Sequence, residues 1–522
     1  MTSHPISLAV VGLLFIIGAA ACHPAPSLIP KTPYQAPVSA TTGADTEATH
    51  VGTQLPATAS ANSPVLALTA PIETEVTKTP SPLSPTTPAP SIYAPSGIEI
   101  HSLAGVDLVQ QAGVYWVRRN ALLWSLVEPV EGERNWEKVA PLEKELVSLS
   151  DKGLHLILII RGTPLWAQKV PGYYCGQIAA DKFDAFGQFL FDAVSRYSAP
   201  PYNVQYFELW NEPDVPPGAV PPDMVYGCWG EPDSLNYGGE FYGRMLQTVY
   251  PKIKAANPDA KVILGGLLLD CDPDHPPETT KGSGVRKDCI SSRFLSGVLE
   301  SGGGTSFDGL SFHSYDYYNR GLGKYSNYNW GSAYSTSGPS LIAKVQYLLS
   351  VLDRYGVSDK FLMNTESALI CGSTGKEDFC LNEDYQATKA IYAVEALAAG
   401  GSVGLQANIW YSLNGWRGSE LVDSDGNTLP AYEALQFYAR LMPESIYLSQ
   451  DDFYQDVPIQ RYRYSANQST VWILWSKEEL DHEIHLEASP KAVYDIFGNS
   501  LPAESRQVVG IFPIYIVWEG LR

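Results

Sequence analysis

Residues 155–160, His-Leu-Ile-Leu-Ile-Ile, form a run in which every side chain after the histidine is aliphatic. A strand with one face in water alternates apolar and polar residues, whereas a strand covered on both faces is apolar almost throughout. The run therefore predicts a strand that is buried on both sides within a parallel sheet.

The same pattern extends in both directions along the chain. From residue 97 to about 441, short apolar runs alternate with longer amphipathic stretches such as 181–197, 242–256 and 383–399, which are long enough to cross back over a sheet. We therefore predict an α/β fold in which eight βα units close into a (β/α)8 TIM barrel. The predicted strands are 97–101, 115–118, 155–160, 204–210, 261–265, 307–313, 360–363 and 403–411.

An open, doubly wound sheet is the alternative arrangement of the same units. Such a sheet usually carries a Gly-rich phosphate-binding loop after its first strand. The segment 97–105, Gly-Ile-Glu-Ile-His-Ser-Leu-Ala-Gly, has no such loop. The sequence therefore favours the closed barrel.

Two glutamates lie within three residues of the ends of predicted strands. Glu212 stands in Phe-Glu-Leu-Trp-Asn-Glu-Pro, 207–213, and Glu366 stands in Phe-Leu-Met-Asn-Thr-Glu-Ser, 361–367. The C-terminal strand ends of a barrel meet at one mouth, where active sites of this fold lie. A pair of carboxylic acids cleaves a glycosidic bond when one protonates the leaving oxygen and the other attacks C1 or activates water. The sequence therefore predicts a glycosidase site at the mouth.

These strand ends resemble those of glycoside hydrolases of clan A, whose acid/base follows an asparagine after the fourth strand and whose nucleophile ends the seventh. The stretches 116–118, Trp-Val-Arg, and 126–129, Leu-Val-Glu-Pro, also resemble the second βα unit of that clan. The layout is most similar to glycoside hydrolase family 39 and related bacterial polysaccharide-cleaving lipoproteins. The resemblance implies a retaining glycoside hydrolase that cleaves β-glycosidic bonds by double displacement.

In that mechanism the two carboxyl groups have different roles. The resemblance makes Glu212 the general acid/base and Glu366 the nucleophile, with their carboxyl groups about 5 to 5.5 Å apart. We expect Glu212 to be kept neutral by a drier or more negative setting and Glu366 to be kept ionised by donors. No cofactor and no metal ion are expected.

The resemblance also implies a set of residues that surround the sugar. Asn211 would bind its 2-hydroxyl group, Arg118 and Tyr315 would hold Glu366 in place, and His313 would share the inward strand face with Tyr315. The expected substrate-binding residues are Asn211, Arg118, His313, Tyr315, Trp410 as a stacking face, and Trp166.

The sequence pattern changes from alternating strands and helices to short strands after the last predicted helix. Short strand-like segments occur at 471–475, 483–487 and 514–518, and in the second of them Ile484 and Leu486 alternate with charged or polar residues. We predict a small antiparallel, β-sandwich-like accessory domain over 442–522, appended to a catalytic barrel over 97–441. Structural support is its expected role, and sugar binding is the alternative.

The N-terminal segment predicts export. The apolar run 8–21 ends in Ala-Ala-Ala before Cys22, which resembles a bacterial lipoprotein signal over 1–22 with Cys22 acylated. His4 but no Lys or Arg precedes the run, so a simple secretory signal is the alternative. Residues 23–96, rich in Pro, Thr, Ser and Ala, predict a disordered linker. We expect an extracytoplasmic protein, secreted or lipid-anchored at the bacterial cell surface.

The cysteine count fits export. Six of the seven cysteines remain when Cys22 is set aside, an even number that allows three disulfides in an oxidising compartment. Sequence alone allows 15 pairings, but positions in the predicted loops favour three of them. A cysteine metal site is disfavoured because no Cys-x-x-Cys spacing occurs. The favoured pairs are Cys175 with Cys228, Cys271 with Cys289, and Cys371 with Cys380.

Composition restricts the binding partner. The 522 residues are 45% hydrophobic and carry a formal net charge of -21. Phosphate binding relies on clustered Lys and Arg, so a nucleic-acid partner is not expected. We expect a carbohydrate partner, with membrane contact only through a lipid at Cys22. The alternative function is a glycan-binding surface lipoprotein on a glycosidase-like barrel that lacks catalysis.

Overall fold

The computed structural model describes residues 96–520, with the exception of 222, 281, 334–337 and 455–456. The predicted signal segment with Cys22 lies outside the described residues, as does the predicted linker up to residue 95.

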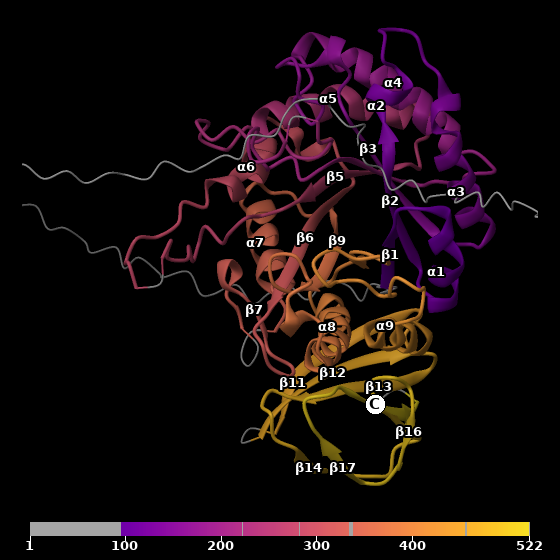
Figure 1. The fold of residues 1–522 in the computed structure, drawn as a ribbon, viewed down its shortest axis with the longest axis vertical. Coiled ribbons are helices and arrows are strands. Elements are labelled where there is room, and N and C mark those ends of the chain that lie inside the picture. The colour runs from indigo at the N-terminus through magenta and orange to yellow at the C-terminus, as the bar shows by residue number, and fades with distance from the viewer. Residues whose placement is uncertain (1–95, 222, 281, 334–337, 455–456, 521–522) are drawn as a thin grey trace, which may run out of the picture. The chain divides into compact units, whose positions relative to one another are not determined.

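Eight parallel strands form a closed barrel (Figure 1). Neighbours pair in chain order from β1 to β6, then β6 pairs with β9, β9 with β10, and β10 with β1. The predicted (β/α)8 fold is therefore confirmed. The strands are β1 (Ser96–Ile100), β2 (Trp116–Leu123), β3 (His155–Arg161), β4 (Tyr206–Asn211), β5 (Lys261–Leu267), β6 (Gly309–Tyr318), β9 (Phe361–Ile370) and β10 (Ala407–Trp410).

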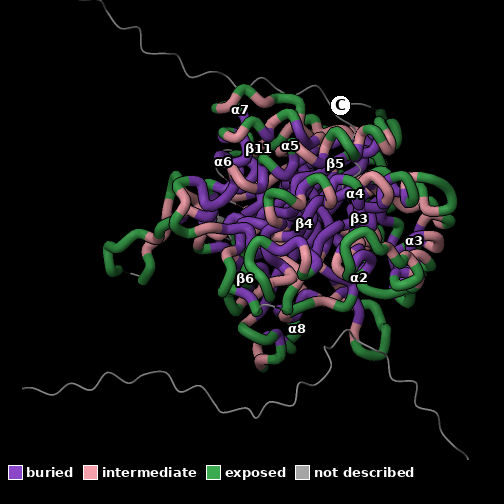
Figure 2. Tube along the Cα trace, turned by 90° about the horizontal axis from the view of Figure 1, so that it is seen from above, coloured by how far each residue is buried: buried purple, intermediate pink, exposed green. Residues whose placement is uncertain are grey.

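A main helix follows each barrel strand, and its apolar face packs on the outside of the barrel. The strands are buried, whereas the loops and the outer helix faces are exposed (Figure 2). The main helices are α1 (Val106–Ala112), α3 (Ala140–Asp151), α4 (Phe183–Tyr197), α5 (Gly239–Ala256), α6 (Phe294–Glu300), α7 (Leu341–Arg354), α8 (Glu383–Ser402) and α9 (Pro430–Leu441), with a short α2 (Trp124–Val127) before α3.

The barrel interior changes from apolar to polar along the strands. Trp116, Ile157 and Met363 belong to an apolar cluster separate from the helix-facing core. Strand side chains on one face recur every two residues, so Arg118 follows Trp116 and Thr365 follows Met363 on the inward face. The polar layer therefore rests on a packed apolar base and lies toward the C-terminal strand ends.

Antiparallel strands follow α9. A six-stranded sheet has the order β11-β12-β13-β18-β15-β16, and β14 pairs with β17. The six-stranded sheet shares a core with α8 and α9, where Phe437 and Tyr515 have ring centroids 5.2 Å apart. The strands are β11 (Ser445–Tyr454), β12 (Val457–Ala466), β13 (Ser469–Ser476), β14 (His482–His485), β15 (Ala492–Tyr494), β16 (Ser500–Leu501), β17 (Arg506–Val509) and β18 (Ile514–Glu519). In the barrel sheet, the short strand β7 (Tyr325–Asn327) pairs with β6, and β8 (Ser332–Ala333) pairs with β7.

Three disulfides link the cysteines of the described chain, and they are the three favoured pairs. The bonds join Cys175 to Cys228, Cys271 to Cys289, and Cys371 to Cys380. Within the described residues, no helix combines the length and the apolar character needed to cross a membrane.

The disulfides should differ in what they contribute to stability. Cys175 and Cys228 are 53 residues apart, whereas Cys371 and Cys380 are 9 apart. Loop-closure entropy predicts a loss of about 4 kcal/mol when the first bond is removed and about 2.5 kcal/mol for the second. Guanidinium unfolding of the two double Cys→Ala variants measures the difference. Equal losses, or a larger loss for the short loop, would contradict the entropic account.

Candidate active site

The C-terminal strand ends form a cleft of 640 Å³. Glu212, at the end of β4, and Glu366, on β9, both line it. Asn211 and Tyr315 line it as well. The structure therefore brings the two predicted catalytic carboxyl groups to one mouth.

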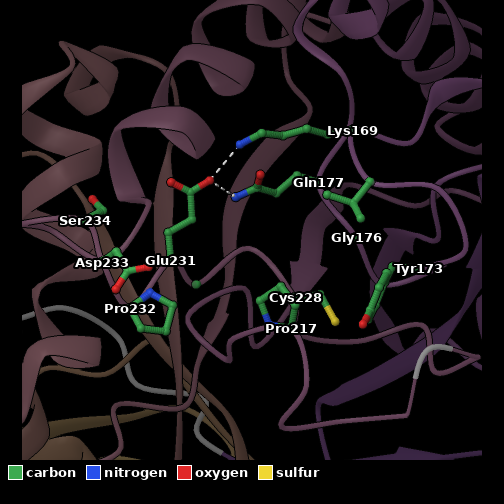
Figure 3. Close-up of a pocket in the computed structure, with 12 residues that line it drawn as sticks. Lys169, Tyr173, Gly176, Gln177, Pro217, Cys228, Glu231, Pro232, Asp233 and Ser234 are labelled. Atoms are coloured by element: carbon green, nitrogen blue, oxygen red, sulfur yellow. Dashed lines mark hydrogen bonds and ion pairs between the residues drawn. The ribbon is translucent and has the colours of Figure 1, made fainter.

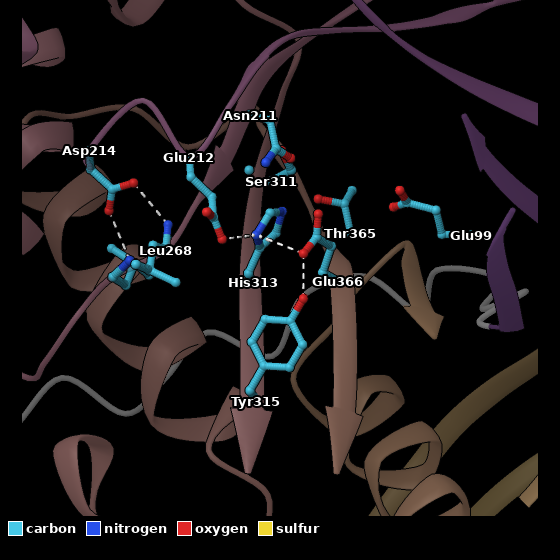
Figure 4. A network of polar contacts seen from close by, with 12 residues as sticks. Glu99, Asn211, Glu212, Asp214, Leu268, Ser311, His313, Tyr315, Thr365 and Glu366 are labelled. Carbon is cyan, nitrogen blue, oxygen red and sulfur yellow. Dashed lines mark hydrogen bonds and ion pairs between the residues drawn. The ribbon is translucent and has the colours of Figure 1, made fainter. Parts of the chain in front are cut away.

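The two carboxyl groups face each other across His313. The Nδ1 atom of His313 lies 2.9 Å from Glu212 Oε1 and 3.3 Å from Glu366 Oε2 (Figure 4). One ligand atom from each of these three side chains lies within 4.8 Å of the others. The facing oxygens of the two carboxyl groups are therefore no more than 4.8 Å apart.

Backbone conformation at the end of β4 directs two consecutive side chains into the cleft. Trp210 has φ 78° and Glu212 has φ 51°, the left-handed region that residues other than glycine seldom adopt. Trp210 is buried among the helices, and its Nε1 donates to the Gly227 carbonyl at 2.9 Å. The turn at Trp210 thus breaks the strand alternation and leaves Asn211 and Glu212 facing the mouth.

An irregularity in β9 has the same effect on the other carboxylate. Phe312 pairs with Asn364 but His313 pairs with Glu366, so Thr365 is an extra residue in the ladder. Such a bulge redirects the side chains beside it. Thr365 Oγ1 donates to Glu208 Oε1 at 3.0 Å, and Glu366 still faces Glu212.

Arg118 is buried beneath the pair and lies within 2.7 Å of oxygen atoms from four side chains. Its Nη1 lies 2.5 Å from Glu366 Oε1 and 2.6 Å from Glu99 Oε2, and its Nε lies 2.7 Å from Glu208 Oε2. Its Nη2 donates to Asn211 Oδ1 at 2.6 Å. Burial disfavours the charged guanidinium, but the three carboxylates outweigh it and raise the pKa of Arg118 well above its ordinary value.

His313 is neutral and orients Glu212. Its Nε2 is 3.5 Å from Arg118 Nη2, and because arginine only donates, Nε2 must accept and Nδ1 must carry the proton. Burial lowers the pKa of His313 to about 4, against the opposing charge of Glu366. A Cβ atom at Gly266 would lie 2.1 Å from His313 Nε2, so glycine leaves the room for the ring.

The donors around the two carboxyl groups differ. Burial raises the pKa of Glu212 to about 7, although the charges of Arg118 and Lys344 oppose the rise. Burial raises the pKa of Glu366 as well, opposed by His313 and Arg118. Glu366 accepts directly from Arg118 and from the Tyr315 hydroxyl, whereas within the described residues the Glu212 carboxyl group is hydrogen-bonded only to His313. Glu366 is therefore the better stabilised carboxylate.

A second layer holds the ends of three strands together. The Asp214 carboxylate accepts from the backbone N–H groups of Leu268 and Leu269 at 2.9 and 2.8 Å (Figure 4). The buried Lys344 donates to the carbonyls of Leu268 and His313 at 2.7 and 2.6 Å. These bonds fix the loop after β5 and the end of β6 behind Glu212.

Of the six predicted substrate-binding residues, Asn211 and Tyr315 line the cleft, and Arg118 and His313 are fully buried beneath it. The two tryptophans do not line it. Trp410 is only 4% exposed, and its Nε1 donates to the Ser419 carbonyl at 2.8 Å. The stacking role expected for Trp410 is wrong, because its neighbour Ile409 belongs to the interior cluster and Trp410 points toward α8. Trp166 packs edge-on against Trp124, with Nε1 bonded to the Glu128 carbonyl.

Several site residues escaped the sequence analysis. Glu99 and Glu208 bind Arg118, and Arg161 and Tyr411 line the cleft. The signal for Glu99 and Glu208 was a single acidic residue inside an otherwise apolar strand, which is costly unless a cation compensates it. Trp416, 49% exposed, provides the aromatic surface in the cleft that Trp410 does not.

Glu212, His313 and Glu366 are also the group of side chains, within the described residues, whose spacing suits a metal ion. The Arg118 guanidinium already contacts Glu366 Oε1. A metal ion would add a second positive charge beside that carboxylate, so the arrangement suits proton transfer and nucleophilic attack better.

A further cavity of 590 Å³ lies between the loops after β3 and β4 (Figure 3). Glu231 Oε1 there accepts from Lys169 Nζ at 2.7 Å and from Gln177 Nε2 at 2.8 Å. Lys169 and Glu231 of this cavity are therefore paired with each other.

No protein-family model and no curated protein matches the sequence. Among solved structures, the chain is similar to a family 39 glycoside hydrolase from Bacteroides cellulosilyticus WH2, with TM-score 0.58, 17% identity, and 82% of this chain and 81% of that chain covered. A family 30 subfamily 8 xylanase from Clostridium acetobutylicum is similar with TM-score 0.54 and 12% identity, over 82% of this chain and 97% of that chain. A family 39 β-xylosidase from Caulobacter crescentus is similar with TM-score 0.52 and 14% identity, over 82% of this chain and 96% of that chain. The resemblance to clan A barrels is thus confirmed in the fold.

The raised pKa of Glu212 can be tested without a substrate. Its pKa of about 7 lies above the ordinary 4.5, so the folded protein retains a proton between these values that the unfolded chain releases. Stability should therefore fall as pH rises through this window, less so in Glu212→Gln. Infrared difference titration should show a carboxyl proton lost near pH 7 that Glu212→Gln lacks.

Glu395→Gln is the matched control, because burial raises the pKa of Glu395 to about 8 at a distant position bonded to Tyr325. This variant should keep the Glu212 transition. A Glu212 that titrates below pH 5 would contradict the assignment of its neutral form.

Proposed function

We propose that the protein is a retaining glycoside hydrolase that cleaves β-glycosidic bonds of a polysaccharide or oligosaccharide outside the cytoplasm. The observation that carries the proposal is the short gap between Glu212 and Glu366, whose facing oxygens lie within 4.8 Å. Retaining glycosidases hold their carboxyl groups about 5 to 5.5 Å apart, whereas inverting enzymes need about 6.5 to 9.5 Å to admit a water molecule.

In the first step, Glu366 attacks C1 while Glu212 gives its proton to the leaving oxygen. The bond from C1 to that oxygen breaks, and a bond from C1 to the Glu366 carboxylate forms. Arg118 and Tyr315 keep Glu366 ionised and aimed until it attacks. Burial keeps Glu212 protonated up to about pH 7.

In the second step, Glu212 acts as the base. It takes a proton from a water molecule, whose oxygen attacks C1 and releases Glu366 as a carboxylate. The two displacements at C1 restore the original configuration. Because His313 contacts both carboxyl groups, it keeps them aligned in both steps.

Asn211 is placed to bind the sugar 2-hydroxyl. Its Oδ1 is occupied by Arg118, which leaves its amide N–H groups to donate into the cleft. A contact to this hydroxyl strengthens as positive charge develops at C1 in the transition state. Trp416 and Tyr317, 49% and 41% exposed, offer apolar faces for sugar rings farther out.

Three disulfides favour an oxidising compartment, and the lipid at Cys22 stays part of the proposal. Similar structures include an endo-β1,6-glucanase as well as the xylanase and the β-xylosidase, so fold similarity supports glycoside hydrolysis without indicating which sugar this chain cleaves.

Substitution of each glutamate tests the two roles. Glu366→Ala and Glu212→Ala should each lose most activity toward a polysaccharide, by at least about a hundredfold. With an activated aryl glycoside, azide should rescue both variants. In Glu366→Ala azide replaces the nucleophile, so the glycosyl azide has inverted configuration. In Glu212→Ala azide attacks the glycosyl-enzyme instead, so the glycosyl azide has the anomeric configuration of the substrate.

Nuclear magnetic resonance of the glycosyl azides identifies the anomers. Glu395→Gln serves as a control for loss of a buried carboxyl group far from the cleft. Full activity in either alanine variant, or the opposite anomers, would refute the assigned roles. A wild-type protein that binds glycans but cleaves none would favour the non-catalytic alternative.

A further inference from the structure

Four positively charged side chains are buried in the described part of the chain: Arg118, Arg161, Lys344 and Lys389. Arg118 has carboxylate partners, Lys344 donates to two carbonyls, and Lys389 donates to the carbonyls of residues 418 and 420. Arg161 has no hydrogen-bond or ion-pair partner among the described residues, and its Nε is an unsatisfied buried donor. A buried cation without a partner is costly.

Arg161 is part of the cleft wall. It is the last residue of β3 and lies on the same strand face as Ile157 of the interior cluster, since side chains on one face recur every two residues. It is 9% exposed and lines the cleft together with Glu212 and Glu366. Its unpaired donors therefore lie where a substrate enters.

The carboxylates of the site are held elsewhere. Glu99 and Glu366 are bonded to Arg118 and form no ion pair with Arg161. Burial lowers the pKa of Arg161 to about 10, with the charge of Glu99 opposing the shift, so the guanidinium stays charged at neutral pH. The protein thus supplies carboxylates to one of two neighbouring arginines and leaves the other without one.

We propose that Arg161 binds the carboxylate of a uronic acid residue, so that the substrate is an acidic polysaccharide. The inference rests on the proposed glycosidase function and specifies its substrate class. A sugar hydroxyl would satisfy one donor but would give the guanidinium no ion pair at contact distance, whereas a carboxylate supplies both the hydrogen bonds and the ion pair. The planar guanidinium also matches the two oxygens of a carboxylate, which a neutral sugar cannot offer.

The test compares polymers that differ only in the carboxylate. Uronic acid-containing polysaccharides are assayed beside the same polymers after their carboxyl groups have been reduced to alcohols. The wild-type protein should prefer the acidic form, and Arg161→Gln should lower that preference at least about tenfold, as expected for loss of a hydrogen bond to a charged group. Arg161→Lys keeps the positive charge but loses the planar guanidinium, so its preference for the acidic polymer should lie between those of the wild type and Arg161→Gln.

Arg196→Gln is the matched control, because Arg196 pairs with Glu143 on the outer face of α4 and has the same charge. It should keep the wild-type preference. A wild-type protein that cleaves reduced polymers as well as acidic ones would overturn the proposal. So would an Arg161→Gln variant that loses activity on both forms in equal proportion, because the arginine would then act only as a counter-charge for Glu99 and Glu366.

A sulfated polymer without carboxylates tests whether Arg161 binds a sugar sulfate rather than a sugar carboxylate. Preference for it over the uronic acid polymer would overturn the carboxylate assignment. If no polymer is cleaved, the proposed hydrolase function fails, and calorimetry with the same polymer pairs decides about Arg161. Binding that requires the carboxylate and Arg161 would uphold the inference, whereas equal binding or none would end it.

Discussion

The buried guanidinium of Arg118 is the interaction on which the rest of the site depends. From β2 it contacts Glu99 on β1, Glu208 and Asn211 on β4, and Glu366 on β9. The carboxylates offset the cost of burying the cation, and removal of one partner from such a network typically costs about 3 to 5 kcal/mol. The bonds that tie these strands together therefore also fix the Glu366 carboxyl group relative to the Asn211 amide.

The same arginine makes two identical side chains different. It contacts Glu366 directly but not Glu212, whose hydrogen-bond partner is the neutral His313. Burial acts on both carboxyl groups, yet only Glu366 has a charged donor and the Tyr315 hydroxyl against it. The charged form of Glu366 therefore has more stabilising contacts than the charged form of Glu212. This difference follows from which strand each residue ends and from what Arg118 can reach.

The fold and the glutamate pair could be predicted because both follow from local patterns, apolar runs of strand length and carboxylates at their ends. The side to which Trp410 points could not be predicted. The expected strand 403–411 began too early, because β10 starts only at Ala407. The expected bounds therefore did not fix which of its side chains face inward. The positive φ of Trp210 and the extra residue Thr365 reverse the phase elsewhere. Such interruptions of the strand alternation depend on contacts between residues far apart in the sequence, so a short sequence segment does not predict them.

Trapping of the covalent intermediate tests most directly whether these two carboxyl groups act on one anomeric carbon. A 2-fluoro glycoside with a good leaving group, carrying a sugar that the protein cleaves, should inactivate it, because the fluorine slows hydrolysis of the glycosyl-enzyme. Peptide mass spectrometry should then find one sugar attached to Glu366, and attachment should disappear in Glu366→Gln. Label on Glu212, or inactivation without any attached sugar, would contradict the account.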